Sequence, residues 1–176
     1  MCQSTPAEGI GSSVKEDDSE SPARRRLAIL LVDHGSKRDE ANSMLDEMAK
    51  MVISRLELTT NVGSDTPSDH EVVGVFPAHM EIAPPSIQDS MREAVLNHRA
   101  EHVVVLPFFL SRGRHIQQDI PALVADAVNC LQSEHGAQFT HEIRPHLGVS
   151  DRLADLLLVR AGLPVPTVHP DGIERS

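Results

Sequence analysis

Residues 27–36, LAILLVDHGS, decide the fold of this chain. The six residues at 27–32 are all apolar, and a run of this length is typical of a β-strand buried on both faces. The turn Asp33–Ser36 follows at once, and over residues 37–56 apolar side chains recur at helical spacing. The stretch therefore predicts a strand of a parallel sheet that leads through a polar turn into an amphipathic helix.

The same alternation continues along most of the chain. Short apolar runs predict three further strands, at 72–76, 102–109 and 138–143. Helical spacing predicts three further helices, after Ser86, from about Asp119, and over 150–161. Strands that alternate with helices form a parallel sheet with helices on both of its faces. We therefore expect an α/β domain of three layers, with a four-stranded, mostly parallel sheet flanked by helices.

Two helix starts carry residues that resemble capping boxes, in which a serine and an acidic residue three positions on satisfy each other's backbone N–H groups. The first pair is Ser36 with Asp39, and the second is Ser86 with Asp89. Between these two helices, residues 57–70 are polar and predict a loop.

Both ends of the chain differ in composition from its centre. Residues 1–24 are rich in Ser, Asp, Glu, Gly and Pro, so they bury too little apolar surface to offset their chain entropy. Residues 163–176 are rich in proline and contain no cysteine. We predict a disordered segment at 1–24, one domain at 25–162 and a loose tail at 163–176.

The composition excludes several classes of function. A net charge of −10 argues against non-specific binding of nucleic acid, and no run approaches the ~20 apolar residues of a membrane span. Cys2 and Cys130 are too few for a disulfide framework, and we expect Cys130 to be a small core residue. We predict a soluble protein with no membrane partner, in the cytoplasm or, in a photosynthetic eukaryote, in the plastid stroma.

Polar residues that can bind metals, transfer protons or bind anions follow the first three predicted strands. These segments are Asp33–Ser36, Pro77–Glu81 and Ser111–His115, and they contain His34, His79, His115, Glu81 and two arginines. Ligands of open parallel sheets bind beyond the carboxyl ends of the strands, so we expect these side chains to meet there.

Each of these residues also has an ordinary structural interpretation. A single histidine at a strand end is more often structural or exposed than a ligand, and Asp33 can simply support the turn that carries His34. At least one of Phe108 and Phe109 is expected in the core. A histidine phosphatase needs an arginine directly before its His-Gly pair, and Asp33 in that place excludes it. Seven histidines are interpreted as structural: His70, His98, His102, His135, His141, His146 and His169.

Three segments resemble the signature blocks of the short, single-domain sirohydrochlorin cobalt- and ferrochelatase family. They are LLVDHGSKRDEAN (30–42), FPAHMEIAPPSI (76–87) and VVVLPFFLSRGRHIQQDIPAL (103–123), and they occur in the family's order. An HGS motif alone is weak, but the three blocks together in one chain are highly specific. The PAHMEIA segment is similar to the ferrochelatases that make sirohaem in plants and algae.

The resemblance implies roles for particular residues. It implies that His34 is the catalytic residue, as both metal ligand and proton acceptor, with His115 as its partner ligand and Glu81 contacting the metal or the macrocycle. It also implies a homodimer, and substrate contacts from one loop: Leu110, Ser111, Arg112, Gly113, Arg114 and His115.

The implied chemistry agrees with the residue types. Neutral imidazole binds borderline metals such as Fe²⁺ or Co²⁺, which are here substrates, and it accepts protons near neutral pH. Sirohydrochlorin is an apolar ring with many carboxylates. From their positions, we expect its carboxylates to meet Lys37, Arg38, Arg112 and Arg114, and its apolar face to meet Phe76, Met80 and Leu110.

Three functions remain open at this point. We favour a ferrochelatase that forms sirohaem, on the PAHMEIA segment; a cobaltochelatase of cobalamin synthesis uses the same ligands, because metal supply often decides which ion is inserted. A non-catalytic metal carrier would keep the histidines without needing the basic loop. Land-plant relatives have an iron–sulfur cluster bound by cysteines near the C-terminus, and we expect none from residues 163–176.

Overall fold

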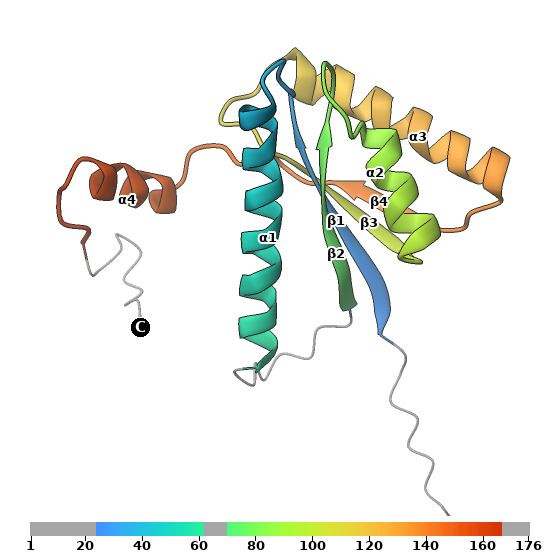
Figure 1. Cartoon of the computed structure of the whole chain (residues 1–176), viewed down its shortest axis with the longest axis horizontal. Coiled ribbons are helices and arrows are strands. Elements are labelled where there is room, and N and C mark those ends of the chain that lie inside the picture. Colours follow the sequence, from blue (N-terminus) through green and yellow to red (C-terminus); the bar gives the residue numbers. More distant parts are fainter. Residues whose placement is uncertain (1–23, 62–69, 167–176) are drawn as a thin grey trace, which may run out of the picture.

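The computed structural model describes residues 24–61 and 70–166, and it confirms the predicted α/β fold (Figure 1). A sheet of four strands lies at its centre, in the order β2-β1-β3-β4, and every neighbouring pair is parallel. The strands are β1 (Arg25–Asp33), β2 (His70–His79), β3 (His102–Pro107) and β4 (Thr140–Ile143). Of the predicted segment 1–24 and the predicted tail 163–176, only residues 24 and 163–166 lie within the described residues.

The helices follow the strands in the predicted order. They are α1 (Asp39–Asn61), α2 (Ile87–Arg92), α3 (Ile120–His135) and α4 (Asp151–Arg160). Two π-helical turns adjoin them: η1 (Glu93–Asn97) continues α2, and η2 (His115–Asp119) precedes α3. The predicted polar loop at 57–70 was wrong in its first residues, because α1 continues to Asn61.

Side chains of β1 alternate between two hydrophobic clusters because successive residues of a strand point to opposite faces. Ala28, Leu30 and Val32 pack into the larger cluster, which α2 and α3 cover. Leu31 joins the smaller cluster under α1, together with Leu45. The strand is therefore buried on both faces, as its unbroken apolar sequence predicts.

The two predicted capping boxes have different outcomes. At α2 the box is confirmed: the Ser86 side chain accepts a hydrogen bond from the Asp89 N–H, and the Asp89 side chain accepts one from the Ser86 N–H. At α1 the box was wrong, because the helix begins at Asp39 and Ser36 lies three residues before it. The amide of Asn42 instead reaches back and bonds both backbone groups of Ser36, at 2.8 and 3.0 Å.

The last helix departs from the expected layering. Helix α4 stands away from the sheet (Figure 1) and has no buried residue. On the α1 side, therefore, only α1 covers the described sheet, and it packs mainly against β2. Among the described residues, no helix is long and apolar enough to cross a membrane.

Candidate metal centre

Three predicted site residues lie next to each other at the carboxyl edge of the sheet. His34 follows β1, Glu81 follows β2, and His115 begins η2 after β3. Because β1 lies between β2 and β3 and all three strands run in the same direction, these segments meet at one edge. The sheet order therefore places side chains that are up to 81 positions apart in the sequence in one group.

The geometry of this group suits a single metal ion. One ligand atom each from His34, Glu81 and His115 lie within 4.8 Å of one another. The Nε2 atom of His34 is 3.7 Å from the Oε1 atom of Glu81, and the rings of His34 and His115 meet edge to face with their centroids 4.9 Å apart. Two imidazoles and a carboxylate form a ligand set for a borderline divalent ion.

The group is open to solvent on one side. The side chains of His34 and His115 are each 42% exposed, and that of Glu81 is 53% exposed. Three protein ligands at an open rim leave coordination positions free for an incoming molecule, which is the arrangement of a reactive metal site and not of a closed structural one.

Asp119 orients His115, a role that we did not predict. Its Oδ2 atom accepts a hydrogen bond of 2.9 Å from Nδ1 of His115, which leaves Nε2 of that ring to bind the ion. Carboxylates that hold a ligating imidazole in this way set its tautomer and its direction. The signal available in the sequence was the spacing of four residues, which brings two side chains together on a helical turn.

His79 does not join the group, although it belongs to the segments predicted to converge. It is buried, and its Nδ1 atom lies 2.5 Å from Oδ1 of Asp33. The same Asp33 oxygen accepts a hydrogen bond of 2.9 Å from the Gly35 N–H. The interpretation of Asp33 as a support for the turn of His34 therefore agrees with the structure.

The loop between β3 and η2 supplies exposed residues beside the centre. Leu110 is 63% exposed, and Ser111, Arg112, Gly113 and Arg114 are exposed as well. The guanidinium of Arg114 is 3.8 Å from the Asp119 carboxylate, a loose contact that leaves it available to an anion. Lys37 and Arg38 are exposed just before α1, on the same edge of the sheet.

Two residues expected to line an apolar binding face were assigned wrongly. Phe76 packs against the core, with its ring 5.0 Å from that of His98, and Met80 is 8% exposed within the same core cluster. Both lie on the inward side of the β2 segment, where the alternation of the strand places them. Phe109 packs against the core as expected, whereas Phe108 is partly exposed.

Cys130 is half-buried on α3 and is not part of the core that we expected it to join. Its sulfur accepts a hydrogen bond of 3.3 Å from the Gln88 amide. A hydrogen bond with the Glu134 carboxylate raises the pKa of the Cys130 thiol above its usual value. The thiol is therefore a weak nucleophile and a poor metal ligand near neutral pH.

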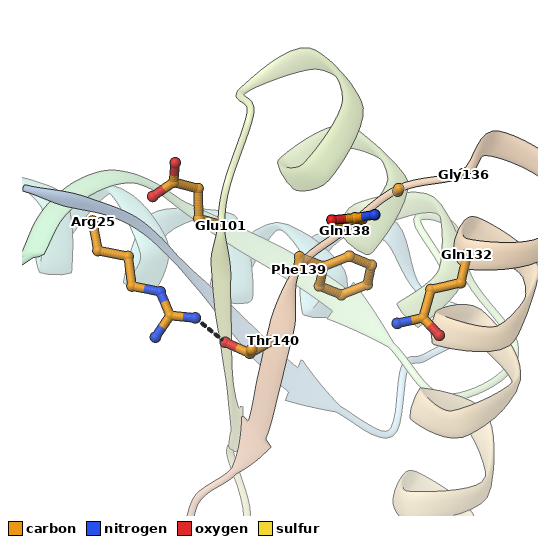
Figure 2. A pocket seen from close by; sticks show the side chains of 8 residues that line it. Arg25, Glu101, Gln132, Gly136, Gln138, Phe139 and Thr140 are labelled. Carbon is orange, nitrogen blue, oxygen red and sulfur yellow. Dashed lines mark hydrogen bonds between the residues drawn. The ribbon is translucent and has the colours of Figure 1, made fainter.

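A separate cavity lies at the opposite, amino-terminal edge of the sheet (Figure 2). It has a volume of about 770 Å³ and is shallow, between the end of α3 and the starts of β1 and β4. Its Arg25 side chain donates a hydrogen bond to Thr140, and Glu101 bonds the Arg26 N–H. In the described residues, these charged groups thus each bond a neighbouring residue at this edge.

Comparisons with known proteins identify relatives of this chain. The chloroplastic sirohydrochlorin ferrochelatase of Arabidopsis thaliana is 44% identical over 99 residues, 56% of this chain and 37% of that protein. The sirohydrochlorin cobaltochelatase of Methanopyrus kandleri is 28% identical over 98 residues, 56% of this chain and 58% of that protein. This chain thus spans less than two thirds of the length of either relative.

Solved structures and a family model extend the comparison. A putative cobalamin biosynthesis CbiX protein from Marinobacter aquaeolei VT8 superposes with a TM-score of 0.50 at 25% identity, covering 78% of this chain and 92% of that one. The sirohydrochlorin chelatase SirB of Bacillus subtilis, in complex with cobalt, shares the fold at a TM-score of 0.51 and 20% identity, covering 78% of this chain and 50% of that one. The family model described as CbiX matches residues 28–162, and the chain therefore belongs to the CbiX family.

Proposed function

We propose that this protein is a sirohydrochlorin ferrochelatase, which inserts Fe²⁺ into sirohydrochlorin to form sirohaem. The observation that carries the proposal is the group of His34, Glu81 and His115, whose ligand atoms lie within 4.8 Å at an open rim. The activity named for the Arabidopsis thaliana relative supports the choice of substrate and of iron.

The proposed reaction needs both metal binding and proton removal. Two N–H bonds of the macrocycle break, the ring nitrogens bind the metal, and two protons leave, with no change in oxidation state. The three side chains hold the ion and leave positions open to the ring nitrogens. As those nitrogens take over the ion, the His34 imidazole is released and can accept one of the two protons, while the other passes to solvent.

The loop beside the centre is proposed to hold the macrocycle. Arg112 and Arg114 can each form two parallel hydrogen bonds with a carboxylate of the substrate, and exposed Leu110 can pack against the ring. Because these contacts form in the ground state and persist in the transition state, removing the charges should raise KM more than it lowers kcat.

Cobalt insertion is the second candidate for the same site. The Methanopyrus kandleri relative is named a cobaltochelatase, and two imidazoles with a carboxylate bind both ions. Insertion rates with Fe²⁺ and Co²⁺, measured side by side without oxygen and at limiting free ion, separate the two functions. The proposed ferrochelatase requires the faster rate with Fe²⁺.

We also infer a homodimer, supported by the apolar residues that α4 leaves in solvent. Leu156, Leu157 and Val159 are about half or more exposed on this helix, and it contacts little of its own chain. A second copy can offer the sheet face that α1 leaves uncovered. For the compartment, the chloroplastic name of the Arabidopsis thaliana relative supports the plastid stroma if the protein comes from a photosynthetic eukaryote.

The proposal is tested by following the visible spectrum of sirohydrochlorin mixed with Fe²⁺ and purified protein under anaerobic conditions. The bands of the metal-free ring should disappear faster than in buffer. His34→Ala and His115→Ala should each lower that acceleration ~100-fold or more, the usual contribution of a catalytic acid or base. His135→Ala, an exposed histidine at the end of α3, is the matched control and should retain the full rate.

Two outcomes would contradict the proposal. If both variants keep the wild-type rate, the site is misplaced. If the wild-type protein binds Fe²⁺ or Co²⁺ but does not exceed the rate in buffer, the carrier function replaces the chelatase function.

A further inference from the structure

A hydrogen-bonded pair, of which His79 is buried and Asp33 is partly buried, lies beside the candidate metal centre in sequence and structure. His79 is 2% exposed and is the last residue of β2, while Asp33 is the last residue of β1. The Nδ1–H group of His79 donates to Oδ1 of Asp33 over 2.5 Å. Neither side chain belongs to the group of three that can hold the ion.

The pair joins the two segments that carry His34 and Glu81. The Met80 N–H donates to the Asp33 carbonyl at 3.0 Å, and the Glu81 N–H donates to the His34 carbonyl at 3.3 Å. The side-chain bond between Asp33 and His79 lies immediately before these two backbone bonds. Three consecutive cross-links therefore hold the turn after β1 against the turn after β2.

Gly35 shows how closely the two turns approach. Its φ angle is +81°, and a Cβ atom built on it would lie 2.2 Å from the carbonyl oxygen of Glu81. The Gly35 N–H donates to the same Asp33 oxygen that accepts from His79. The Asp33 carboxylate thus bonds Gly35 in the turn after β1 and His79 at the end of β2, and so joins the two segments.

The geometry points to Asp33 and His79 as a positioning pair that sets the separation of His34 and Glu81 for metal binding. This inference rests on the proposed function only in that His34 and Glu81 bind the ion. His115 is held separately by Asp119, so the pair acts on two ligands and leaves the third unchanged. Groups that orient metal ligands typically contribute ~10–100-fold to the affinity for the metal.

The test is a titration of the full-length protein with Co²⁺ in the absence of any tetrapyrrole. His79→Phe keeps the bulk of the ring and removes the donor, so it should weaken Co²⁺ binding ~10-fold or more. His79→Asn places an amide N–H near the position of Nδ1 and should recover most of the affinity. Asp33→Asn, which loses the charge but keeps the shape of the side chain, should also weaken Co²⁺ binding. It replaces His79→Phe in the test if that variant does not fold.

Ser90→Ala is the matched control for a purely structural loss. Ser90, on α2, is also buried, and its hydroxyl donates at 2.5 Å to the carbonyl of Pro77, a β2 residue outside the two turns. This variant should lower the melting temperature and leave the Kd for Co²⁺ unchanged.

The inference is overturned if His79→Phe and Asp33→Asn lower only the melting temperature, as Ser90→Ala does, or if wild-type protein does not bind Co²⁺. Failure of the proposed function gives a different result. In that case Co²⁺ binding still depends on His79, but the wild-type protein does not accelerate insertion into sirohydrochlorin.

Discussion

The two faces of the sheet are covered very differently. On one face, α2 and α3 enclose the larger cluster, which includes Leu30, Met91 and Leu131 at full burial. On the other face, α1 alone encloses a cluster of four buried residues, and α4 stands away from the sheet (Figure 1). The candidate metal centre lies at the carboxyl edge of this sheet.

This difference shows that amphipathic spacing predicts an apolar helix face but not the surface that will cover it. Helices α3 and α4 both have apolar residues at helical spacing. Five residues of α3 are buried, whereas α4 has none.

The largest effect is expected on the closed face. Leu131 is fully buried between α3 and the sheet, so Leu131→Ala removes apolar contacts and leaves a cavity that its tightly packed neighbours cannot fill. We expect a loss of ~3–5 kcal/mol, measured by urea denaturation monitored by circular dichroism. A loss below ~1 kcal/mol would mean that this face is not the main core.

A smaller effect is expected from the same change on the other face. Leu45 is also buried, but its cluster is small and borders exposed parts of α1, such as Met44. The neighbours can therefore relax, and Leu45→Ala should cost ~2 kcal/mol, near the lower end for buried leucine. Equal losses for the two variants, in the same urea experiment, would remove the contrast between the faces.

The cap of α2 is expected to contribute less than either core residue. Ser86→Ala removes the side chain that bonds Asp89, and it should cost ~1 kcal/mol. The Ser86 hydrogen bonds lower the pKa of the Asp89 carboxyl, so this contribution is present above the ordinary aspartate pKa and is lost as the pH falls through the lowered one. The difference between wild type and variant should therefore shrink below about pH 4, and a difference that grows there would contradict this assignment.

The smallest effect on unfolding is expected in α4, where Leu157 is 70% exposed. Leu157→Ala should change the free energy of unfolding of the separated chain by less than ~0.5 kcal/mol. If α4 docks on a second copy, Leu157→Asp should instead dissociate the dimer in sedimentation experiments. Arg160→Asp, an exposed position on the same helix that changes the charge by two units, is the charge control and should leave the dimer intact. An unchanged oligomeric state for Leu157→Asp would contradict the docking of α4.

Much of the fold was predictable from local patterns. The strands β1 and β3 are short apolar runs with polar ends, so their positions follow from composition alone. The capping box of Ser86 and Asp89 was equally predictable, because both partners lie within one turn. The box at Ser36 was not, because Asn42, six residues away, supplies a better partner for its backbone groups.

The candidate site was predictable where residue types and strand ends coincide. His34, Glu81 and His115 each follow a strand, and parallel strands end at one edge. The roles of Asp119 and of the pair formed by Asp33 and His79 required the structure. These are contacts between side chains, and nothing in a single sequence says which histidine at a strand end turns inward.

The sequence by itself determined the order of strands and helices, the polar turns that follow the strands, and the residue types available to bind a metal, because these depend on local spacing and side-chain chemistry. Only the tertiary structure decided that β1 lies between β2 and β3, that His79 turns into the protein while His34 and His115 face one another, and that α4 stays off the sheet. The physical reason is that strand order and side-chain direction are selected by packing between segments far apart in the chain, and local spacing contains no information about that competition.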